Sequence, residues 1–157
     1  VGLSRRTFLG RAAAIAGAAA LPQWVLSCAP RARRPHIVLI MCDDLGYGDV
    51  GFTGATAYST PRIDRIAHEG VTLTQAYSAA PVCSPTRVAL MTGRYAQREP
   101  SGLHEPLTTH PIGLAADPPT LPRSLKDAGY RTALVGKWHL GTASEYHPRR
   151  HGFEEFY

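Results

Sequence analysis

A cysteine and an arginine four residues apart carry the most informative chemistry in this chain of 157 residues. Cys83 and Arg87 belong to the string Cys-Ser-Pro-Thr-Arg, and we predict a helix over 86–91. Side chains four residues apart share one face of a helix, so the guanidinium would lie beside a potential nucleophile. The alternatives are that Cys83 is a packing residue or an inert thiol, and that Arg87 forms a surface ion pair.

Two adjacent carboxylates, Asp43 and Asp44, follow the apolar run 36–42. The run has the length and β-branched content of a strand buried on both faces of a parallel sheet, and Cys42 would be buried in it. Ligand sites in open α/β sheets form at the carboxyl ends of strands. Two carboxylates there can bind one hard cation, because calcium and magnesium prefer oxygen ligands. The alternative is a solvated turn.

A lysine and a histidine, Lys137 and His139, follow a second predicted strand over 131–135. In an extended chain these two side chains would point the same way. Lys137 could then stabilise negative charge at the same edge of the sheet. A solvated loop is the alternative.

The remaining elements must position these groups. We predict a helix that starts after Thr60 and ends at Gly70, a short strand over 71–77, a loop over 95–119, and a helix capped by Thr120 and ended by Gly129. Strands that alternate with helices predict an α/β fold with a mostly parallel sheet flanked by helices.

The positive net charge of +5 comes from the first 35 residues. Six of the 17 Lys and Arg residues lie there without any acid, so the remaining 11 nearly balance the 12 Asp and Glu residues. A near-neutral body without a basic stripe argues against nucleic acid as a partner.

The start of the chain is typical of an export signal. Residues 4–9 resemble a twin-arginine motif, and the apolar run 12–21 is too short to span a bilayer. We therefore predict a signal peptide over 1–28 and export by the twin-arginine machinery. The expected location is the periplasm, or the cell envelope through a lipid anchor.

The residues Val-Leu-Ser-Cys at 25–28 look like a lipobox, in which Cys28 would be lipidated and would tether the protein to the membrane. The alternatives are ordinary cleavage near Ala29 or a retained anchor. Residues 29–35 would form a tether and 36–157 the folded domain. Three cysteines, of which the third is Cys83, do not predict a disulfide framework.

Four strings together resemble the type I sulfatases. They are 81–93 around Cys83, Asp-Asp-Leu-Gly-Tyr-Gly-Asp at 43–49, 129–139 with Lys137 and His139, and 152–157. The resemblance covers 35–157 and implies an alkaline-phosphatase-like fold. Sulfatases run to several hundred residues, so 36–157 would be the N-terminal part of a catalytic domain that is incomplete at its C-terminus.

The resemblance implies a chemical role for Cys83. In the family a formylglycine-generating enzyme, which reads Pro85 and Arg87, oxidises this cysteine to formylglycine. One hydroxyl of the aldehyde hydrate attacks the sulfur of a sulfate ester, and the other then expels sulfate. Arg87 would hold the nucleophile's oxygens and help to balance the charge.

The other site residues also take their roles from the resemblance. Asp43 and Asp44, with the converted Cys83, would bind a divalent metal, usually calcium or else magnesium. Lys137 would hold the sulfate oxygens, and His139 would hydrogen-bond the hydrate. Asp49 would support the loop. Five other histidines would be structural or surface residues: His68, His104, His110, His147 and His151.

Two other functions stay open at this point. One is a phosphonate or phosphate monoester hydrolase of the same superfamily, and the other is a truncated, non-catalytic exported binding protein. Further metal ligands of the family, an Asp-Asn pair, come from downstream sequence. We therefore expect the 157-residue chain alone to be inactive.

Overall fold

The computed structural model describes residues 34–102, 104–105 and 111–157. The chain divides into two units, 1–41 and 42–157. The predictions for the signal peptide, Cys28, 29–33 and His110 lie outside the described residues. Within the described residues, no helix is long and apolar enough to cross a membrane.

The two strands predicted over 36–42 and 71–77 are not formed. Ile37 to Met41 are exposed, and Cys42 is an exposed free thiol, so its predicted burial was wrong. A strand requires a hydrogen-bonded neighbour, which an apolar run does not itself supply. At 71–77 the chain turns, and the amide of Ala76 donates to the carbonyl of Leu73.

The helix α3, Pro61–Glu69, confirms the prediction at both ends. Thr60 precedes it, proline occupies its first turn and Gly70 ends it. The Thr60 hydroxyl donates to Asp64 Oδ1 at 2.8 Å, and the amide of Phe52 donates to the same oxygen at 2.9 Å. Asp64 thereby links the start of α3 to the short 3-10 helix η2, Gly51–Thr53.

The helix α4, Cys83–Thr92, begins three residues earlier than predicted and places Cys83 in its first turn. The first turn tolerates Pro85, because the amides there have no partner within the helix. The helix ends at Gly93, whose φ of 67° lies in the left-handed region. Val88 and Met91 are buried in a core with four other residues, Ala96, Leu114, Trp138 and Leu140.

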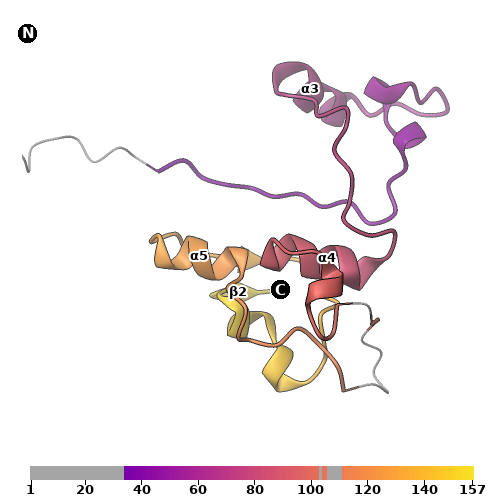
Figure 1. The fold of residues 1–157 in the computed structure, drawn as a ribbon. Helices are drawn as coiled ribbons and strands as arrows, with labels where there is room; N and C mark the ends of the chain where they lie inside the picture. Colours follow the sequence, from indigo (N-terminus) through magenta and orange to yellow (C-terminus); the bar gives the residue numbers. More distant parts are fainter. Residues whose placement is uncertain (1–33, 103, 106–110) are drawn as a thin grey trace, which may run out of the picture. The chain divides into compact units, whose positions relative to one another are not determined.

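The helix α5, Leu121–Asp127, lies beside α4 (Figure 1). The strand β1, Ala133–Leu134, pairs in parallel with β2, Glu155–Phe156. This pairing confirms a parallel α/β arrangement on a small scale, although β2 was not predicted. Two residues are too few to show a strand's periodicity.

The histidine of the segment before β2 is fully buried. His151 is 0% exposed, and its ring centroid lies 5.2 Å from that of Trp138. Neither ring nitrogen has a hydrogen-bond partner among the described residues. Burial, and secondarily the charge of Arg123, lower the pKa of His151 from 6.5 to about 4. Its predicted structural role is therefore consistent with its position, while His68, His104 and His147 are exposed.

This buried ring predicts an acid-dependent loss of stability. As the pH falls from 6.5 towards 4, the unfolded chain takes up a proton on His151 that the folded chain does not. The free energy of unfolding should fall by roughly 2 kcal/mol over this interval. Urea unfolding at several pH values measures it. The slope should flatten in His151→Phe and remain in His68→Gln; an unchanged slope in His151→Phe would contradict the assignment.

Candidate active site

The carboxylate of Asp43 lies between two cations from distant parts of the chain. Asp43 Oδ2 is 3.0 Å from Lys137 Nζ, and Oδ1 is 3.6 Å from an Arg87 guanidinium nitrogen. The hydrogen bond from Lys137 lowers the pKa of the Asp43 carboxyl below its usual 3.8, against an opposing effect of burial and with further help from the charges of Lys137 and Arg87. Asp43 is therefore ionised at neutral pH.

The thiol of Cys83 lies at the same place. Its Sγ is 3.2 Å from Lys137 Nζ and 3.9 Å from Asp43 Oδ1. The hydrogen bonds to Asp43 and then to Cys83 raise the pKa of Lys137, so this amine stays a cation. The structure thus brings together four of the predicted site residues in one cluster: Asp43, Cys83, Arg87 and Lys137.

Local structure explains how these groups meet. Because α4 begins at Cys83, Arg87 lies one turn further on the same face, and its side chain is only 11% exposed. The guanidinium also donates to the carbonyl of Lys137 at 2.6 Å. Lys137 follows β1 and the left-handed Gly136, whose φ is 104°. The turn after β1 and the start of α4 are therefore held directly against each other.

We predicted that the segment after β1 is extended through His139, and this prediction was wrong. The φ of His139 is 55°, a left-handed conformation that separates its direction from that of Lys137. Lys137 reaches Asp43 and Cys83, whereas His139 Nδ1 lies 3.3 Å from Glu105 Oε2. Within the described part of the chain, the His139 side chain makes no hydrogen bond with Cys83.

Glu105 is a site residue that the sequence did not reveal. Its Oε1 accepts from the amide of Ser84 at 3.1 Å, and its Oε2 accepts from the Ser84 hydroxyl at 2.9 Å. The same hydroxyl lies 2.7 Å from the carbonyl oxygen of His139. A single acid in a predicted loop carries no local pattern, so only the fold shows that it contacts the residue after Cys83.

The predicted metal ligands are only partly gathered. Asp43 approaches Cys83, but Asp44 has a φ of 60° and makes no hydrogen bond or ion pair within the described ranges. Among those residues no group of three or more His, Cys, Asp or Glu side chains is placed to hold a metal ion. Both Asp43 oxygens face cationic side chains, and the metal site at Asp43, Asp44 and Cys83 stays a prediction.

Asp49 supports the loop, as predicted. Its Oδ2 accepts from the amide of Gly46 at 2.6 Å. This contact closes the short 3-10 helix η1, Tyr47–Asp49, which follows Asp43 and Asp44 in the chain.

A potential nucleophile beside two cations, on an α/β framework, is the arrangement expected of an enzyme that handles an anionic ester. The chain belongs to the sulfatase family, because the family model described as Sulfatase matches residues 35–157.

Individual relatives are similar over most of this chain. Steryl-sulfatase of Mus musculus is 46% identical over 138 residues, which cover 81% of this chain and 22% of that protein. N-acetylgalactosamine-6-sulfatase of Canis lupus familiaris is 40% identical over an alignment that covers 97% of this chain and 28% of that protein. The chain therefore spans about a quarter of the length of these curated relatives.

The fold is also similar to a solved structure. The crystal structure of Ps i-CgsB superposes with a TM-score of 0.69 and 41% identity, over 73% of this chain and 25% of that one.

The contact between Lys137 and Asp43 predicts a measurable shift. In Lys137→Met the pKa of Asp43 should rise towards 3.8, because the largest cause of its lowering is removed while Arg87 remains. Titration of the carboxyl carbon by NMR, with a chelator present, measures this pKa. Lys126→Met removes a cation 3.8 Å from Glu154 instead and should leave Asp43 unchanged. An unaltered Asp43 midpoint in Lys137→Met would refute the contact.

Proposed function

We propose that the protein hydrolyses sulfate monoesters, with Cys83 as the precursor of the nucleophile. The single observation that carries this proposal is the position of Cys83 Sγ, 3.2 Å from Lys137 Nζ and beside Asp43 and Arg87. Membership of the sulfatase family supports it. The activity belongs to the whole protein, of which relatives indicate that this chain is about a quarter.

In the mature enzyme Cys83 would be a formylglycine, so its Sγ marks where the oxygens of the aldehyde hydrate would lie. That group supplies one hydroxyl to attack sulfur and a second to release sulfate. Pro85 is buried in the first turn of α4, and the Arg87 side chain is 11% exposed. If the formylglycine-generating enzyme reads both residues, it must act before this part of the chain is folded.

Lys137 would bind the sulfate oxygens, and Arg87 would hold the nucleophile's oxygens and help to balance charge during the reaction. Two cations face one carboxylate, which leaves net positive charge beside Cys83. A fixed ammonium and guanidinium stabilise developing negative charge without reorganising at the moment of reaction. The hydrogen bond from Arg87 to the Lys137 carbonyl keeps both cations at the same point.

Asp43 and Asp44 would hold the metal, calcium or alternatively magnesium. The ionised, 48% exposed carboxylate of Asp43 fits a hard cation, and the thiol of Cys83 does not fit until it is replaced by oxygen. When bound, such an ion would act as a Lewis acid that lowers the cost of an attacking alkoxide. Lys137 and Arg87 would then share Asp43 with the ion.

His139 would direct its free ring nitrogen to the hydrate. Glu105 lies beside Nδ1, which leaves Nε2 as the nitrogen for hydrogen bonding at the site. We further propose that the whole protein has an alkaline-phosphatase-like sheet flanked by helices, into which 36–157 fits as the N-terminal part. The similarity to Ps i-CgsB supports this fold.

We also propose export by the twin-arginine machinery, with 1–28 as signal peptide and 29–35 as tether. This route carries folded proteins, so Cys83 can be oxidised before transport. Lipidation of Cys28 would place the enzyme at the cell envelope, and ordinary cleavage would release it into the periplasm. The paired arginines and the short apolar run of the leader support this proposal.

Replacement of Cys83 tests the proposal. In the full-length protein, co-expressed with the generating enzyme, Cys83→Ala should lower kcat for an aryl sulfate by at least about a thousandfold, because no nucleophile remains. Cys42→Ala removes the exposed thiol next to Asp43 and should retain activity within about threefold. Full turnover by Cys83→Ala would contradict the proposed function.

Paired substrates separate a sulfatase from the superfamily's phosphonate hydrolases. We expect a higher kcat/KM for an aryl sulfate than for the matched aryl phosphonate, because the chain belongs to the sulfatase family and its curated relatives are sulfatases. Steady-state rates of the full-length enzyme on both esters measure this ratio. A ratio that favours the phosphonate would assign the protein to the other activity.

A further inference from the structure

We propose that Glu105 is a positioning residue that ties the His139 ring to the first turn of α4 and so fixes both around residue 83. This inference rests on the proposed function, because His139 and Cys83 take their roles from it. No hydrogen bond joins the side chains of those two residues among the described residues, and Glu105 is a group that lies against both sides.

The carboxylate of Glu105 contacts both sides of the site. Its two oxygens accept from the amide and hydroxyl of Ser84, which is 1% exposed and directly follows Cys83. Oε2 also lies 3.3 Å from His139 Nδ1. The Ser84 hydroxyl closes the loop by its contact with the carbonyl oxygen of His139. Displacement of Glu105 would therefore disturb α4 and His139 together.

The position of Glu105 suits a negative charge. The Ser84 amide belongs to the first turn of α4, where N–H groups lack partners within the helix and the helix dipole favours an anion. In the described part of the chain, His139 Nδ1 is buried without an aligned hydrogen-bond partner, and Glu105 Oε2 is the acid oxygen within ion-pair distance. A small rotation of the ring would align the two, and would place the proton on Nδ1.

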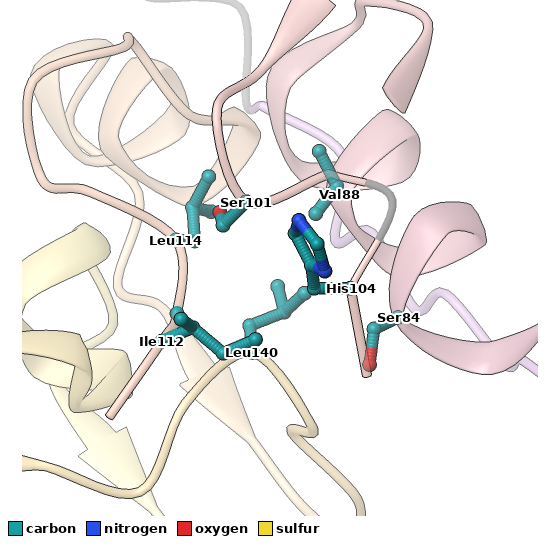
Figure 2. Close-up of a pocket in the computed structure, with 8 residues that line it drawn as sticks. Ser84, Val88, Ser101, His104, Ile112, Leu114 and Leu140 are labelled. Atoms are coloured by element: carbon teal, nitrogen blue, oxygen red, sulfur yellow. The ribbon is translucent and has the colours of Figure 1, made fainter. Parts of the chain in front are cut away.

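The packing behind Ser84 offers its amide no second acceptor among the described residues. A cavity of about 10 Å³ lies on that side, large enough for about one water molecule. In Figure 2 the ring of His104 and the side chains of Val88 and Leu140 surround this space, with Ser84 at its edge. Glu105 is therefore the acceptor that the described residues provide for the Ser84 amide.

The test compares Glu105→Gln with the matched control Glu99→Gln in the full-length protein. The amide introduced by Glu105→Gln keeps the volume and one acceptor for Ser84 but has no charge for His139. Glu99 is a buried acid that pairs with Arg94 at 3.0 Å. Nitrogen-15 NMR of the His139 ring reports which nitrogen carries the proton, and kinetics on an aryl sulfate give kcat and KM separately.

We expect the wild-type His139 ring to be protonated on Nδ1. Glu105→Gln should shift its signals towards the other tautomer and lower kcat about 10- to 100-fold, with KM changed less than about threefold. Glu99→Gln should leave the ring signals and kcat unchanged even if its melting temperature falls.

Three results would overturn the inference. They are a wild-type His139 protonated only on Nε2, unchanged ring signals in Glu105→Gln, and kcat within about twofold of wild type in that variant. The first needs no variant and so does not depend on how Glu105→Gln folds. The tautomer is also measured in Cys83→Ala, so failure of the positioning role is distinguishable from failure of the proposed sulfatase activity.

Discussion

The ion pairs of Asp43 with Lys137 and Arg87 are the interaction on which the site depends. Asp43 and Lys137 are 94 positions apart in sequence, and Arg87 belongs to a third segment. The pair of Asp43 with Lys137, whose side chains are 48% and 39% exposed, contributes little to stability because water screens it. The importance of both ion pairs is geometric, because one carboxylate holds two cations beside Cys83. Without the negative charge of Asp43, the two cations would repel each other at this place.

Sequence predicted the parts of the molecule that local signals determine. The bounds of α3 and α5 follow from threonine, proline and glycine at their ends, and these act within one helical turn. The cluster of Asp43, Cys83, Arg87 and Lys137 was also predicted, because its motifs are contiguous strings. Each string carries its own turn or helix start. The contacts between the strings are seen only in the folded structure.

The failed predictions all concern residues whose partners lie elsewhere. Apolar residues at 36–42 and 71–77 suit strands, but a strand forms only beside a neighbour. The side chain of His139 was expected to point the same way as that of Lys137, but the left-handed φ of His139 changes its direction. No hydrophobic pattern in the sequence encodes such a backbone angle. Glu105 resembles any loop acid until Ser84 and His139 are seen against it. Tertiary contacts, not propensity, give these residues their roles.

The proposed mechanism requires that residue 83 is a precursor and not a final side chain. Mass spectrometry of the peptide that contains Cys83, from protein co-expressed with the generating enzyme, tests it most directly. Conversion of the thiol to the aldehyde should lower the peptide mass by about 18 Da, while the Cys42 peptide keeps its thiol mass. An unmodified Cys83 peptide would contradict this conversion and favour a protein that binds without catalysis.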